Sequence, residues 1–175
     1  MKHFVRIFFL LCLVVPTTLQ AQNFRAEIKQ PKLAAQAAAE DMVATLFTNL
    51  KAGKSQEIAE WITGQVGYNW DATTKVQQTN EFKSQLDVIL ISPPASSYGA
   101  LDSYDLIDES YLPGSDRYFR RTYISYHEGA PLVWEFRFYV KPDGGTALNA
   151  IQWEGKNPFE YMSTGDMLLN RWYDN

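Results

Sequence analysis

Residues 131–141, PLVWEFRFYVK, decide the fold class of this chain. From Leu132 to Val140 every second residue is apolar, and residues such as Glu135 and Arg137 stand between them. A β-strand points successive side chains to opposite faces, so this period of two predicts a strand with one buried and one polar face. The buried face of such a strand needs a second layer of structure to cover it.

Three further segments of similar character surround this strand and are separated from one another by short turns. The turns contain Pro113-Gly114, Glu128-Gly129 and residues 142–145, and Pro followed by Gly suits the centre of a type II turn. Short connections favour antiparallel neighbours, so the second half of the chain is predicted to be a β-meander. Its strands are expected at residues 101–112, 116–127, 131–141 and 146–156.

The first half of the chain has a helical period instead. Between Lys32 and Ala52, apolar residues recur at every fourth position, and Gly53 follows as a C-terminal cap. The residues of this stripe are Ala38, Met42, Leu46 and Leu50, and Val43 and Phe47 widen it.

Two shorter helical segments follow the first. Ser55 is predicted as the N-cap of a second helix that ends between Gly64 and Gly67, and Asp71 or Thr73 as the start of a third. The third is stopped at Pro93-Pro94. Three helices before a meander predict an α+β fold, with the helices on one face of a curved antiparallel sheet.

The order of these elements resembles the NTF2-like superfamily, also described as cystatin-like or SnoaL-like. The resemblance covers about residues 33–156 and rests on the stretch 134–139, on Gly144-Gly145 and on the closing residues 151–153. The segment from Tyr104 to Ile107, with Tyr123, is similar to the earlier strands of that superfamily. The resemblance implies a single cone-shaped domain with a cavity between the helices and the concave face of the sheet. It does not decide the function, because this fold hosts isomerases, dehydratases, immunity proteins and assembly subunits.

Residues 1–21 have the order of a secretory signal peptide. Lys2 and Arg6 precede an apolar run at residues 8–15, Pro16 breaks the run, and Ala21 offers a small residue for cleavage. The run is shorter than the roughly 20 residues that span a bilayer. We therefore expect cleavage near Ala21 and export to the periplasm or the medium, with an uncleaved anchor as the alternative. The exported part, residues 22–175, is expected to be one domain.

The composition of residues 22–175 excludes several chemistries. Loss of Lys2 and Arg6 leaves 14 basic against 20 acidic residues, a net charge of −6, which disfavours binding to nucleic acid. Loss of Cys12 leaves no thiol, and His127 is then the single histidine. We expect no metal and no cofactor, no membrane span after cleavage, and a solvated turn position for His127.

Aromatic residues make up 14% of the chain and suggest a ligand pocket. A small apolar molecule or a partner protein is the expected ligand, and plain core packing is the alternative reading, favoured for Trp134, Phe136 and Phe138. The predicted pocket residues are Trp61, Tyr68, Tyr104, Tyr123 and Trp153.

Asp105 and Tyr104 are the catalytic candidates. A carboxylate held in an apolar cavity has a raised pKa and can act as a general base, with a tyrosine as acid, which describes an isomerase or hydratase. The alternative is a solvated edge strand whose charges prevent aggregation. No catalytic motif accompanies these residues, so a non-enzymatic binding domain is favoured.

The polar positions of the middle strands suggest a third function, that of a structural homodimer or an envelope-assembly subunit. Opposite charges on neighbouring strands stabilise a sheet face, and an arginine fork could instead bind an anion. The residues expected on this dimer face are Arg120, Glu135, Arg137 and Tyr139.

Overall fold

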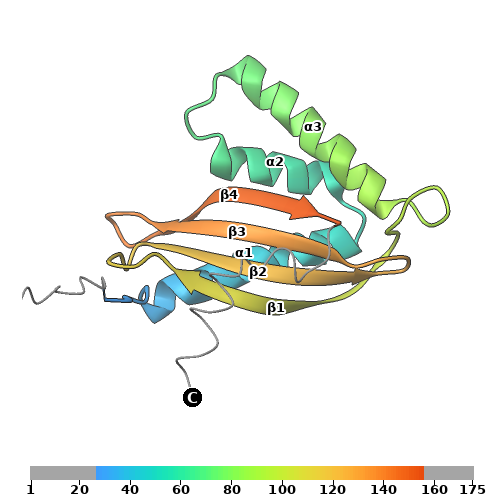
Figure 1. Cartoon of the computed structure of the whole chain (residues 1–175). Helices are drawn as coiled ribbons and strands as arrows, with labels where there is room; N and C mark the ends of the chain where they lie inside the picture. The colour runs from blue at the N-terminus through green and yellow to red at the C-terminus, as the bar shows by residue number, and fades with distance from the viewer. Residues whose placement is uncertain (1–26, 156–175) are drawn as a thin grey trace, which may run out of the picture.

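A four-stranded antiparallel sheet carries three helices on one of its faces (Figure 1), in a computed structural model that describes residues 27–155. The strand order is β1-β2-β3-β4, so strands that follow one another in the chain are also neighbours in the sheet. The predicted α+β class and the antiparallel meander are therefore confirmed. The strands are β1 (Leu101–Tyr111), β2 (Tyr118–His127), β3 (Leu132–Val140) and β4 (Thr146–Glu154).

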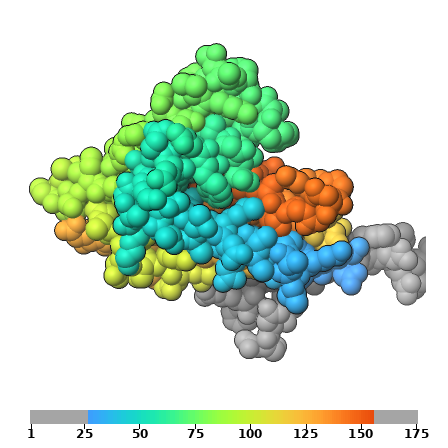
Figure 2. Space-filling model, turned by 180° about the vertical axis from the view of Figure 1, so that it is seen from behind, coloured from blue at the N-terminus to red at the C-terminus, as the bar shows by residue number. Residues whose placement is uncertain are grey.

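The three helices form two levels above the sheet. Helix α1 lies along the sheet and contacts both of its edge strands, while α2 contacts β4 and α3 packs on α2. Figure 2 shows α1 and α2 covering the sheet when the molecule is seen from behind. The helices are α1 (Leu33–Lys51), α2 (Ser55–Val66) and α3 (Ala72–Leu90).

The core includes residues of the sheet and of all three helices, and its part between the sheet and α1 contains a cluster of aromatic rings. Trp134, Phe136 and Phe138 are fully buried on the helix-facing side of β3, as their alternation predicts. Phe47 reaches them from α1 and meets Trp134 edge-on, with 5.5 Å between ring centroids. Tyr104 on β1 stacks on the ring of Phe47, with 4.1 Å between ring centroids. Aromatic rings therefore fill the space between the two layers.

The buried face of α1 contains most of the predicted stripe. Val43, Leu46, Phe47 and Leu50 are buried as predicted, whereas Ala38 and Met42 are only half-buried. Ala35 and Ala39 are buried instead in the N-terminal half of the helix.

Helix caps agree with the sequence for α3 but not for α2. Asp71 accepts a hydrogen bond from the backbone N–H of Thr74 at 2.8 Å, and this bond holds the pKa of the carboxyl below its usual value. The prediction of Ser55 as an N-cap is wrong, because Lys54 is the cap residue and Ser55 lies inside the helix. Ser55 is buried against α3, and its hydroxyl donates to the Asp87 carboxylate instead.

The turn between β1 and β2 has the predicted features of a type II turn. Ser115 N–H donates to the carbonyl of Leu112 at 3.0 Å, and Gly114 has a φ of +81° at the third position of the turn. The expected signal peptide and a short helix expected near residues 167–173 lie outside the described residues. Within residues 27–155, no helix is long and apolar enough to cross a membrane.

Candidate functional site

Most of the predicted pocket residues lie in the packed interior. Tyr123 is 4% exposed, and Trp153 packs against Trp134 with 5.1 Å between ring centroids. Trp61 is half-buried against the same core. Trp61 and Trp153 therefore contribute mainly to packing, whereas Tyr123 also lines a groove.

A small groove of about 250 Å³ opens between α1 and the edge strand β1, and we call it the edge groove. It brings together Tyr104, Tyr123 and Asp105, which the sequence predicted to be functional. Its α1 side is formed by Glu40, Val43 and Ala44.

The two catalytic candidates point to opposite faces of β1, as neighbouring residues of a strand do. Tyr104 pairs with Ser125 and stacks on Phe47 on the helix side. Asp105 is exposed, and it accepts a hydrogen bond from the Tyr126 hydroxyl, which raises the pKa of Tyr126. Both residues line the edge groove, but their side chains leave β1 on opposite faces, so they do not converge on one point.

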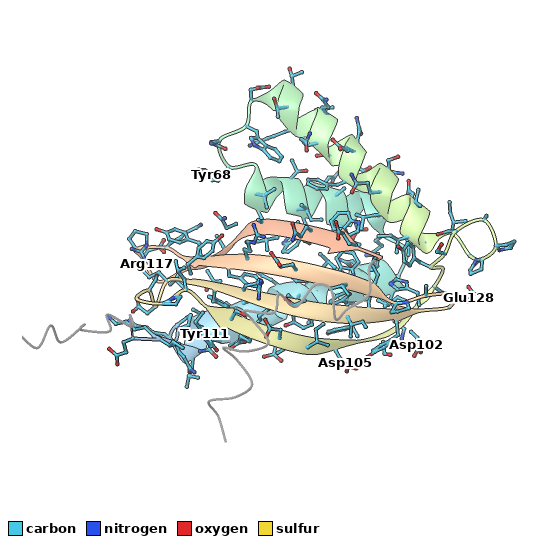
Figure 3. All side chains as sticks on the ribbon, in the orientation of Figure 1. Tyr68, Asp102, Asp105, Tyr111, Arg117 and Glu128 are labelled. Carbon is cyan, nitrogen blue, oxygen red and sulfur yellow. The ribbon has the colours of Figure 1, made fainter. Side chains whose placement is uncertain are left out.

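A larger groove of about 570 Å³ lies between the C-terminal end of α2 and the β3–β4 hairpin, and we call it the hairpin groove. Figure 3 shows Tyr68, which follows α2, and Arg117, beside the hairpin, at the same end of the molecule. The volume lies within the range of about 300–1,000 Å³ that is usual for small-molecule sites. The lining residues are Gly64, Gln65, Val66, Tyr68, Tyr139, Lys141, Ala147, Leu148 and Asn149.

Two tyrosines of the hairpin groove differ in how firmly they are held. Tyr68 is 80% exposed in the loop after α2. Tyr139 is fixed by Arg117, whose Nη2 donates to its hydroxyl at 2.6 Å and whose guanidinium carbon lies 5.0 Å from its ring centroid. Arg117 is fixed in turn by a 2.8 Å hydrogen bond from Nε to the carbonyl of Val140. Tyr139 is thus a rigid wall of the groove.

A third groove of about 240 Å³ adjoins the hairpin groove on the far side of Lys141. Its charged residues are Lys32 before α1, Asp116 and Arg117 before β2, and Lys141 itself. Because Lys141 lines both grooves, three cationic groups gather at this end of the molecule.

Three of the residues predicted for a dimer face bind one another within the chain. Arg120 lies 3.6 Å from Glu135, and Arg137 lies 2.5 Å from it. Arg120 also pairs with Asp108 at 3.2 Å. The predicted pairing of opposite charges across strands is therefore present, whereas Tyr139 lies apart in the hairpin groove.

His127 is buried, which corrects its predicted solvated position. Its exposed fraction is 9%, and its Nδ1 lies 3.0 Å from the carbonyl of Gly99, to which it donates. Nε2 is then free to accept from the Ser125 hydroxyl at 2.9 Å, and that oxygen accepts from Trp134 Nε1 at 2.8 Å. His127 is the last residue of β2, next to the turn, as predicted. The loop that contains Gly99 covers its side chain.

Ser125 and His127 have the hydrogen bond of a nucleophile and its base. Ser125 is 0% exposed, however, so a substrate has no route to its hydroxyl. Burial also lowers the pKa of His127, which keeps the imidazole neutral. This pair is a polar link inside the core.

Arg121 and Glu109 form a second polar link, on the helix side of the sheet. Arg121 Nε lies 2.6 Å from Glu109, and its Nη1 donates to the carbonyl of Gln36 at 3.1 Å, which ties β2 to α1. Among residues 27–155, no three His, Cys, Asp or Glu side chains are placed to hold a metal ion. Comparisons with family models, curated proteins and solved structures found no match to this chain.

Proposed function

We propose that the protein is an exported, non-enzymatic domain of the NTF2-like type that binds a small apolar molecule in the hairpin groove. The groove itself carries this proposal, because it has the largest volume among the grooves with partly enclosing walls described above. Export rests on the signal-like residues 1–21, and the family on the order of the elements.

The lining of the hairpin groove suits a small apolar ligand. Val66 and Ala147 supply aliphatic surface with the buried Leu148 behind them, and Tyr68 and Tyr139 supply rings with a polar end. Sites for small molecules are usually built in this way, from apolar walls and a few polar groups that fix orientation.

The same lining has tyrosines and a lysine but no carboxylate or imidazole to act as their partner in proton transfer, which supports binding without turnover. None of its residues carries a carboxylate, an imidazole or a thiol. Elsewhere, the Ser125–His127 pair is buried, and Asp105 and Tyr104 point to opposite faces.

Gly64 offers a direct test, because a Cβ added to it meets no atom within 4 Å. Gly64→Trp should fill the hairpin groove from α2, while Gly64→Ala should leave it open. We expect decanol, measured by isothermal titration calorimetry, to bind the unaltered protein and Gly64→Ala, and to bind Gly64→Trp at least about tenfold more weakly. Equal binding by all three proteins would place the ligand elsewhere, and absence of binding to the unaltered protein would end the proposal.

A further inference from the structure

The cationic end of the hairpin groove has no part in holding an apolar molecule. Lys141 is exposed at the boundary of two grooves, and no ion pair of residues 27–155 uses its ammonium group. Arg117 lies beside it, and Lys32 faces it across the smaller groove. These three cations outnumber the one acidic residue of the smaller groove, Asp116, although the chain as a whole has a net charge of −4.

Asp143, two residues after Lys141 in the chain, is engaged by the turn. Asp143 accepts a hydrogen bond from Gly145 N–H at 2.8 Å, which holds it within the β3–β4 connection. The charge of Lys141 is therefore only partly balanced by its neighbours, and it is available to a ligand.

Arg117 adds a fixed charge behind this lysine. Its Nε and Nη2 are used by Val140 and Tyr139, and no described residue accepts a hydrogen bond from its Nη1. A guanidinium remains charged at all relevant pH values, so the positive field at the end of the groove is permanent.

We propose that the ligand is an anionic amphiphile, an unbranched apolar chain that ends in a carboxylate. The inference rests on the proposed function of the hairpin groove. The chain lies against Val66, Ala147 and Leu148, and the carboxylate binds the ammonium group of Lys141. Arg117 acts as a positioning residue, because it holds Tyr139 and strengthens the field without contacting the chain.

The experiment compares decanoate, decanol and decylamine, which share one chain and differ in the charge of the head group. In calorimetry at low ionic strength, we expect decanoate to bind about tenfold more tightly than decanol, and decylamine more weakly than both. Added salt should reduce the advantage of decanoate, because an exposed ion pair is screened.

Lys141→Gln should remove the preference for decanoate, so that decanoate and decanol bind this variant with similar affinity. Lys54→Gln is the charge control, because it removes a lysine at the N-terminal end of α2, whereas the groove lies at the C-terminal end of this helix of 12 residues, which is about 18 Å long. Lys54 pairs with Glu57 at 3.0 Å and does not line the groove. That control should retain the preference.

The outcomes separate this inference from the proposed function. Equal affinities for decanoate and decanol, or a preference that persists in Lys141→Gln, would overturn the carboxylate site while the groove remains a site for apolar chains. Tighter binding of decylamine would overturn it as well. If none of the three compounds binds, both proposals fall.

Discussion

Ser125 and His127 show how single residues of the interior set the response of this fold to acid. The neutral imidazole accepts from Ser125 and donates to Gly99, and burial lowers its pKa below the usual 6.5. As the pH falls below about 6.5, the unfolded chain binds a proton that the folded chain resists. The free energy of unfolding should therefore decrease with acidification in that range.

Urea unfolding at about pH 7.5 and about pH 5.5 measures this effect. The carboxyl groups of Asp71 and Asp87 do not obscure it, since their pKa values lie below 3.8. His127→Gln cannot titrate, so its stability should change less between the two conditions. Equal changes in the two proteins would contradict the assignment of the buried neutral imidazole.

Ser125→Ala tests the same network without a change of charge. The substitution leaves Trp134 Nε1 and His127 Nε2 without their described partner, in a region with no exposed surface. We expect a loss of about 1–3 kcal/mol in the free energy of unfolding, the usual cost of an unsatisfied buried polar group. Ser97→Ala, in the loop before β1, is a control with the same change of side chain and should alter stability by less than about 0.5 kcal/mol.

For single residues, the sequence predicts whether a side chain is buried better than it predicts whether that side chain lines a groove or packs in the core. The alternation along residues 132–140 correctly predicted that Trp134, Phe136 and Phe138 are buried. It could not separate a ring that lines a hollow from a ring that fills one, because both need the same apolar pattern. Trp153 was therefore predicted for a pocket, whereas it packs against the core.

Helix α2 is the element on which the proposed site depends. Its Gly64 allows a separate prediction about stability. Gly64 lies inside the helix with open space around its Cβ position. Gly64→Ala should raise the free energy of unfolding by about 0.5–1 kcal/mol, since glycine is the costlier residue in a helix interior. Thermal unfolding checks this, and a decrease in stability would mean that the position tolerates no side chain.

Elements were predictable where a local rule governs them. The periods of four and two located all seven elements to within a few residues, and Asp71 caps α3 as its type and position predict. Ser55 shows the limit of such rules, because its hydroxyl binds Asp87, 32 residues further along the chain. The hairpin groove was missed for the same reason, since no sequence pattern joins Val66 to Ala147 and Leu148.

For the whole molecule, the two ends of the sheet differ in charge. Asp102 and Asp105 are exposed on the first half of β1, whereas Lys32, Arg117 and Lys141 gather near the β3–β4 hairpin. Figure 3 shows the labelled aspartates and Arg117 at opposite ends of the sheet. This separation directs an anionic ligand to the hairpin groove and away from the edge groove.

The most direct test of the account is the location of the bound chain, measured by NMR chemical shifts of residues 22–175 during titration with decanol. We predict that the largest changes occur at Val66, Ala147 and Leu148. Changes centred on Tyr104 and Leu106 in the edge groove, or no localised change at saturation, would contradict the assignment of the hairpin groove as the binding site.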